Sequence, residues 1–211
     1  AIERLKLAEK MRRSDARQFY DKASEALSCY LTDRFGMAEI ELTGDNLERT
    51  LAEARRLEDL AQRFLTFSHF LYLGRWVSFP VALEGALKLK EISYLHAEGY
   101  AGGEMKHGPI ALIDEDMPTL AVVPKDRAYE KMLSNISEIK ARSGYVLGLA
   151  FDNDREIINH TDEVIQVPAC SPLWSPFLTV LPLQLFAYHI AAKRGADVDQ
   201  PRNLAKSVTV E

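Results

Sequence analysis

The chain has little cysteine and no excess of positive charge. Its two cysteines, Cys29 and Cys170, match neither a metal-ligand nor a redox spacing, which predicts reduced thiols in a cytosolic protein. The formal net charge of -5 argues against a nucleic-acid-binding surface, because such a surface needs clustered Lys and Arg. Dinucleotide-binding glycine fingerprints, P-loops and zinc-ligand spacings are absent too, so the sequence indicates neither a metal nor an organic cofactor.

A membrane span and a signal peptide are not predicted either. Residues 173–192 contain no Asp, Glu, Lys or Arg and are about as long as a spanning helix. Two prolines, a glutamine and a histidine in this stretch make a poor lipid-facing surface, so a buried helix is expected instead. Residues 1–30 are charged and helical in pattern, unlike a signal peptide. The chain opens inside that pattern without a methionine, which suggests a piece of a longer cytoplasmic protein.

The pattern of the chain changes near residue 66. Charged amphipathic helices are expected over 1–32 and 45–66, and strand and helix patterns alternate afterwards. Strands are predicted at His69–Gly74, Thr119–Pro124, Tyr145–Ala150 and Glu163–Val167, and helices at Phe79–Leu95, Tyr129–Arg142 and Leu173–Arg194. This alternation predicts a parallel sheet in a three-layer α/β/α sandwich, preceded by a helical segment. Ligands are then expected beyond the carboxyl ends of the strands, after Leu73, Val123 and Ala150.

The first of these later helices carries a narrow charged stripe, which consists of Glu84, Lys88 and Glu91. A rotation of about 100° per residue aligns the three side chains. The opposite side of the helix holds small or apolar residues: Ala82, Ala86, Leu89 and Ser93. Because the flanks are apolar as well, the stripe is expected to face a pocket. One interpretation is an i,i+4 ion pair between Glu84 and Lys88, worth about 0.3–0.5 kcal/mol. The other is a base that moves a proton on carbon next to a carbonyl.

Two further segments are candidates for a site. Glycines and a Gly-Pro pair predict a shaped loop over His96–Pro109 rather than a helix or strand. Its His107 is interpreted either as a surface or capping group or as a general acid/base. The C-terminal residues 201–211 alternate apolar and polar side chains. They form either a tail that packs on the body or one that closes over a pocket and presents Lys206 to a ligand.

Three separated segments together resemble one family. Residues 82–92 (ALEGALKLKEI), 103–109 (GEMKHGP) and 197–211 (DVDQPRNLAKSVTVE) are similar to the glutamine:fructose-6-phosphate amidotransferases, also called glucosamine-6-phosphate synthases. The similarity runs from about Leu73 to the C-terminus. It implies a flavodoxin-like sugar-isomerase (SIS) fold. The expected organisation is a helical lead-in at 1–66, an SIS domain at 67–196 and a tail at 197–211 that closes over the sugar site.

The resemblance also implies a role for each of the matching residues in a ketose/aldose isomerisation. Glu91 matches the base that carries a proton between C1 and C2 of the sugar. Lys206 matches the lysine that forms an imine with open-chain fructose 6-phosphate, a reaction that needs no pyridoxal. Glu84 and Lys88 match supporting charges around the sugar oxygens. His107 matches the histidine that opens the sugar ring.

The same resemblance implies partners and a missing part. In the family the ring-opening histidine comes from the neighbouring subunit, so a homodimer is expected, and Ala205 lines the sugar site through its backbone. The reaction joins glutamine-derived ammonia to fructose 6-phosphate and yields glucosamine 6-phosphate. The family's hydroxyl-rich phosphate loop and glutaminase cysteine have no counterpart in this sequence. A fragment of a synthase is therefore expected, and a non-catalytic phosphosugar-binding regulatory module or a structural dimerisation piece are the alternatives.

Overall fold

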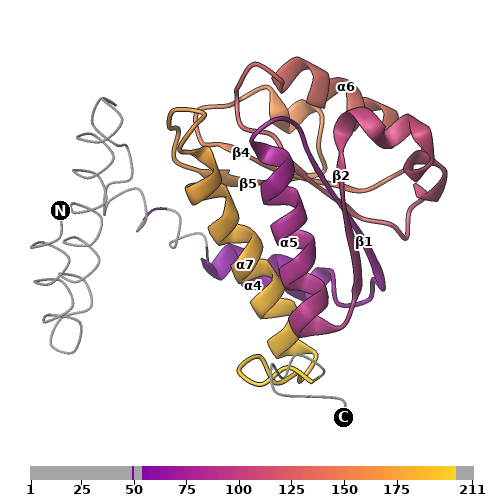
Figure 1. The fold of residues 1–211 in the computed structure, drawn as a ribbon, viewed down its shortest axis with the longest axis vertical. Coiled ribbons are helices and arrows are strands. Elements are labelled where there is room, and N and C mark those ends of the chain that lie inside the picture. The colour runs from indigo at the N-terminus through magenta and orange to yellow at the C-terminus, as the bar shows by residue number, and fades with distance from the viewer. Residues whose placement is uncertain (1–48, 50–53, 203–211) are drawn as a thin grey trace, which may run out of the picture.

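The computed structural model describes residue 49 and residues 54–202 (Figure 1). The helix expected over 1–32 and the tail beyond Arg202 lie outside the described residues, and so do Ala205 and Lys206. Of the helix expected over 45–66, the structure describes α4, Ala54–Arg63.

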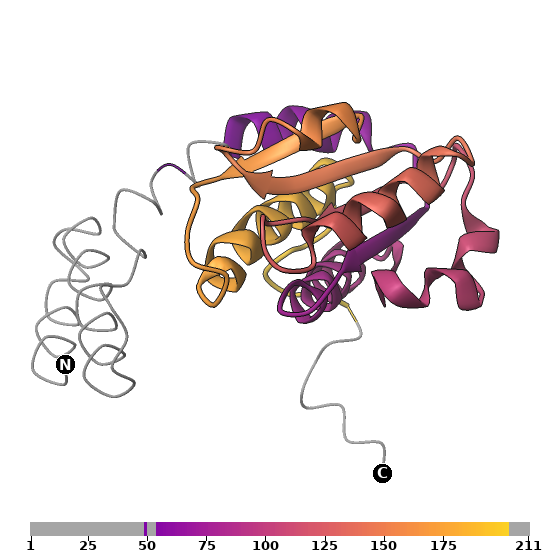
Figure 2. The ribbon, with the colours of Figure 1, turned by 90° about the horizontal axis from the view of Figure 1, so that it is seen from above.

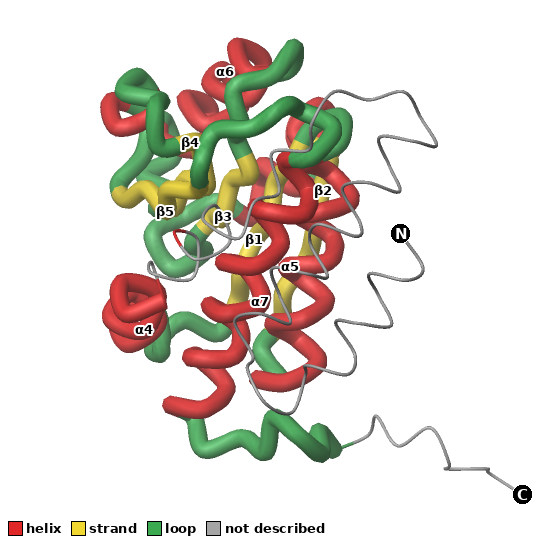
Figure 3. The backbone as a smooth tube through the Cα atoms, turned by 90° about the vertical axis from the view of Figure 1, so that its left-hand side faces the viewer, coloured by secondary structure: helices red, strands yellow, loops and turns green. Residues whose placement is uncertain are grey.

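A parallel sheet of five strands forms the centre of the molecule (Figures 1 and 3). The strands are β1 His69–Gly74, β2 His96–Ala101, β3 Thr119–Val122, β4 Val146–Phe151 and β5 Glu163–Val167, in the order β2-β1-β3-β4-β5. The helices are α5 Ser78–Ser93, α6 Tyr129–Lys140 and α7 Ser175–Lys193, with short 3-10 helices η1 Gly102–His107, η2 Pro109–Leu112 and η3 Ile157–Asn159. This strand order is the flavodoxin-like one, in which the order of the strands along the sheet reverses between β1 and β3.

Helices cover both faces of the sheet (Figures 1 and 2). Successive side chains of a strand point to opposite faces, so the strands supply two separate cores. Phe70 and Tyr72 join the core formed with α4, α5 and α7. Leu71 and Leu73 join the core formed with α6 and the short helices. The three-layer sandwich expected from the sequence is confirmed.

One prediction was wrong. The segment His96–Ala101 is not a loop but the edge strand β2, which pairs along its whole length with β1. Its sequence, HAEGYA, lacks the apolar run of a buried strand because an edge strand has one side open to solvent. The remainder of the expected loop folds into η1 and η2. Gly108 between them has φ 144°, a conformation that favours glycine.

The charge-free stretch near the C-terminus forms α7, as expected. Among the described residues, α7 is the helix that is long and apolar enough to cross a membrane, judged by length and composition alone. Half of its most apolar window is nevertheless buried, and Leu183, Phe186 and Ile190 are completely enclosed in the core shared with α4 and α5. A core helix passes the same test of length and composition, and the packing of α7 assigns it that role.

Candidate functional site

The charged stripe lies on the outer side of α5, and close packing of the inner side fixes its direction. The residues that the sequence placed on the inner side are all buried: Ala82, Ala86, Leu89 and Ser93. Gly85, also on this side, lies so close to Tyr72 and Leu183 that a Cβ atom there would come within 3 Å of both side chains. The sheet therefore holds α5 with Glu84, Lys88 and Glu91 facing away from it.

Lys88 connects the three charges. Its Nζ lies 2.7 Å from Glu91 Oε2 and 3.7 Å from Glu84 Oε1. The hydrogen bond to Glu91, together with the negative charge of both carboxylates, raises the pKa of Lys88. The expected Glu84–Lys88 pair is present, yet the shorter contact joins Lys88 to Glu91 at i,i+3. The ammonium therefore remains charged between two carboxylates, which hold it from both sides along the helix.

The stripe starts beside an open, mostly apolar hollow of about 480 Å³ between α5 and α7. Glu84 is the charged residue that lines it. Apolar residues such as Val77, Pro80, Phe177 and Val180 form the rest of the lining. Lys88 and Glu91 follow along α5, away from this hollow, with side chains roughly one third and one quarter exposed. The charges are thus only partly screened by protein.

His107 lies on the other face of the sheet. The preceding residues of η1 contact the α6 layer: Met105 is buried in the core formed with α6, and Lys106 Nζ lies 3.0 Å from Glu138 Oε1 on that helix. His107 itself is about three quarters exposed, with Glu104 4.0 Å away. Because Glu91 lies on α5, a single chain places these two candidate residues on opposite faces of the sheet.

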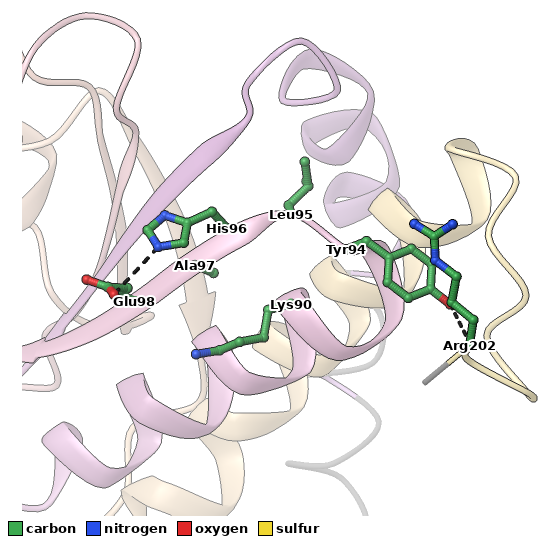
Figure 4. A pocket seen from close by; sticks show the side chains of 7 residues that line it. All are labelled: Lys90, Tyr94, Leu95, His96, Ala97, Glu98 and Arg202. Carbon is green, nitrogen blue, oxygen red and sulfur yellow. Dashed lines mark hydrogen bonds and ion pairs between the residues drawn. The ribbon is translucent and has the colours of Figure 1, made fainter. Parts of the chain in front are cut away.

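The last described residue of the chain contacts the carboxyl end of α5 (Figure 4). The backbone N–H of Arg202 donates a hydrogen bond of 2.8 Å to the hydroxyl of Tyr94. The guanidinium of Arg202 lies 4.2 Å from the centroid of the same ring. Tyr94 ends α5 with φ 61°, and its N–H bonds to the carbonyl of Lys90. Glu91 precedes Tyr94 by three residues on α5, which is about one helical turn.

Tyr94 and Arg202 also border a hollow of about 770 Å³ at the amino end of β2 (Figure 4). Lys90, His96 and Glu98 supply its other polar side chains. His96 Nε2 lies 3.5 Å from Glu98 Oε1. Glu98 also accepts a hydrogen bond of 2.5 Å from Tyr100, and this bond is the main reason why the pKa of Glu98 is lowered. Sequence reasoning missed this hollow because Tyr94 and Arg202 are 108 positions apart and belong to no common motif.

At the carboxyl edge, where the sequence predicts a ligand, the structure brings basic side chains together. Arg75 follows β1, and its Nε donates to Asn135 Oδ1 at 2.9 Å. Trp76, with φ 50°, lies under the guanidinium of Arg127, 4.6 Å from the ring centroid. No cluster of three metal-binding side chains occurs in the part of the chain that the structure describes.

A sequence profile of the SIS domain matches residues 68–194. The chain belongs to the SIS domain family. Its matched residues comprise the complete sheet and all helices from α5 to α7.

Individual relatives carry a more specific name. A glutamine–fructose-6-phosphate aminotransferase (isomerizing) of Aquifex aeolicus is 57% identical over 165 residues, which are 78% of this chain and 28% of that protein. The enzyme of the same name from Chlorobaculum tepidum is 52% identical over 84% of this chain and 29% of its own length. The solved C-terminal domain of a glucosamine-fructose-6-phosphate aminotransferase from Francisella tularensis superposes with a TM-score of 0.71 at 40% identity, covering 74% of this chain and 44% of that structure. The chain thus spans less than a third of the length of these two curated relatives.

Proposed function

We propose that this chain is an isomerase unit of a glutamine:fructose-6-phosphate aminotransferase, which acts in the cytoplasm on fructose 6-phosphate. The observation that carries the proposal is the meeting of the tail with α5: the contact between Arg202 and Tyr94 starts the tail one turn from Glu91. Identities above 50% to proteins of that name support the same substrate class.

The proposed chemistry uses an amine and a carboxylate. Lys206 Nζ attacks C2 of open-chain fructose 6-phosphate, and the carbonyl oxygen leaves as water when the imine forms. Ammonia later replaces the lysine nitrogen. Glu91 then takes a proton from C1 and returns it to C2, which converts the ketose skeleton into that of glucosamine 6-phosphate. Lys88, held in its charged form by Glu91 and Glu84, orients Glu91 and balances charge near the sugar oxygens.

Ring opening requires a second copy of the chain. His107 and Glu91 occupy opposite faces of one sheet, so His107 serves the site of a partner in a homodimer. The backbone of Ala205, next to Lys206 in the sequence, lines the sugar site. The glutamine-derived ammonia comes from a part of the protein other than this chain.

Proton NMR tests the proposal directly. Glucosamine 6-phosphate in deuterated buffer should lose its C2 proton signal in the presence of the chain, because Glu91 exchanges that proton with solvent. Glu91→Gln should abolish the exchange. Glu130→Gln, which neutralises an exposed carboxylate at the start of α6, is the matched control and should leave it unchanged. A folded parent chain that causes no exchange refutes the proposal that this unit carries the isomerase site by itself.

A further inference from the structure

The amino ends of β1 and β2 bring two histidines together. His69 and His96 are register partners in the parallel pairing of these strands, so their side chains leave the sheet on the same face. Phe70 and Ala97, the residues that follow them, point into the core formed with α5. The two histidine side chains therefore lie on the opposite face, and both are exposed to solvent.

The two rings approach each other through one nitrogen each. His69 Nδ1 lies 3.4 Å from His96 Nδ1, and the ring centroids are 5.4 Å apart with an angle of 70° between the ring planes. The rings thus meet by their edges and do not stack. Their nitrogen separation is longer than the roughly 2.7–3.2 Å of an ordinary hydrogen bond donated by N–H. A direct hydrogen bond between the two rings is therefore weak.

The same separation is the one that a shared zinc ion requires. Zn²⁺ binds a histidine nitrogen at about 2.0–2.1 Å and prefers tetrahedral geometry. Two ligand atoms at the tetrahedral angle of about 109° are then about 3.3–3.4 Å apart. With the same bond lengths, two ligands at the right angles of a square-planar or octahedral ion are only about 2.8–3.0 Å apart. The spacing of His69 and His96 therefore favours tetrahedral zinc.

A carboxylate supports the form of His96 that can bind a metal. His96 Nε2 lies 3.5 Å from Oε1 of Glu98, two residues further along β2 (Figure 4). Tyr100 donates a hydrogen bond of 2.5 Å to the other oxygen of this carboxylate and so holds it in place. A carboxylate beside Nε2 favours the tautomer that carries its proton there, which leaves the lone pair of Nδ1 available to a metal.

We propose that His69 and His96 are the two protein ligands of a surface Zn²⁺ site, and that Glu98 is a positioning residue for His96. Water supplies the remaining two ligands, since no third His, Cys, Asp or Glu side chain completes a metal-binding group in the described part of the chain. The ion joins β1 to the edge strand β2 where both strands begin, and it stabilises their pairing. This inference does not depend on the function proposed above.

Calorimetric titration of the whole, tag-free 211-residue chain with zinc chloride tests the site. The parent should bind Zn²⁺ after residual metal has been removed with a chelator. Glu98→Ala should weaken binding by about tenfold, because the partner that orients a metal-binding histidine is lost. Glu98→Gln keeps an oxygen acceptor for Nε2–H and should recover most of that affinity. His69→Ala and His96→Ala each remove a ligand, so each should weaken binding by more than Glu98→Ala does.

A matched control and a second readout separate ligation from a loss of folding. His160→Ala removes a histidine between η3 and β5, at the other edge of the sheet, and should leave the affinity unchanged. Added zinc should raise the thermal unfolding midpoint of the parent and of His160→Ala, because the ion binds the folded state, but not that of His69→Ala. Circular dichroism without zinc shows whether each variant folds, and His69→Gln replaces His69→Ala if the latter does not.

Two results would overturn the site. One is a parent chain that binds no zinc, which leaves the two rings as a weakly hydrogen-bonded pair. The other is parental affinity in both His69→Ala and His96→Ala, which places the bound ion on other residues. Parental affinity in Glu98→Ala, combined with loss of binding in the two histidine variants, overturns the positioning role of Glu98 and supports the two ligands.

Discussion

Replacing Gly85 by alanine measures how closely α5 is seated on the sheet. A Cβ at this position would lie 2.7 Å from Leu183 Cδ1 and 2.9 Å from Tyr72 Cε1. Both neighbours are completely buried, so neither side chain can turn into solvent to make room. Overpacking of this kind costs about 1–3 kcal/mol, and the better helix propensity of alanine returns up to about 1 kcal/mol. The expected net loss in the free energy of unfolding is about 1–2 kcal/mol.

Urea denaturation followed by circular dichroism is the assay. Gly85→Ala should lower the midpoint without changing the slope of the transition. Gly103→Ala is the matched control, because a Cβ there would meet the Arg75 guanidinium at an ordinary 3.4 Å. Its free energy of unfolding should stay within about 0.5 kcal/mol of the parent. Equal stability of the two variants would refute the close seating of α5.

A double-mutant cycle identifies the clash itself. Leu183→Ala alone should cost about 2–5 kcal/mol, since it opens a cavity in the core of α5 and α7. In the Gly85→Ala background the same change also relieves the contact with the new methyl group. The double variant should therefore lose at least about 1 kcal/mol less than the two single losses combined. Simple additivity would show that Tyr72, not Leu183, resists the methyl group.

Three shorter predictions concern the charged groups. Tyr100→Phe should raise the pKa of Glu98 in a carbon NMR titration, because the hydroxyl that stabilises the carboxylate is removed. The small contribution of Glu98 to the free energy of unfolding is present above its ordinary pKa and is lost as the pH falls through the lowered one. Lys88→Met should destabilise by under about 1 kcal/mol at neutral pH, and the difference from the parent should vanish as pH rises through the elevated pKa of Lys88, because the ion pair with Glu91 then disappears in the parent too. Lys206→Ala should reduce turnover far more than sugar-phosphate affinity, measured by calorimetry; a loss of affinity alone would indicate a regulatory module instead of an enzyme.

Sequence periodicity predicted the inner parts of the fold well. The strands at His69–Gly74 and Glu163–Val167 have the predicted ends, and the helix from Tyr129 ends two residues earlier than expected. These elements bury apolar side chains, so their pattern reports directly on the core. The helical stripe could be predicted for the same reason: the small residues opposite Lys88 mark the side that the sheet covers.

Other parts of the site left no readable pattern. The pairing of Tyr94 with Arg202 depends on the crossover that brings the ends of α5 and α7 together, and no local signal encodes it. The position of His107 relative to Glu91 likewise depends on which face of the sheet each connection covers. The spacing of residues along the chain predicts which side of a single helix or strand is buried. It does not predict which elements contact each other, and those contacts became visible only in the structure.

The polar composition of β2 has a consequence for association between molecules. A parallel sheet with an open edge offers a row of unpaired backbone groups to any extended chain in solution. In β2 that edge carries an exposed His96 and a half-exposed Glu98, whose lowered pKa keeps the carboxylate charged in mildly acidic solution. An incoming strand would have to strip water from both side chains before it could pair. The polar residues that make β2 hard to predict from its sequence thus also disfavour the pairing of another strand with this edge. Pairing of that kind is a route to aggregation.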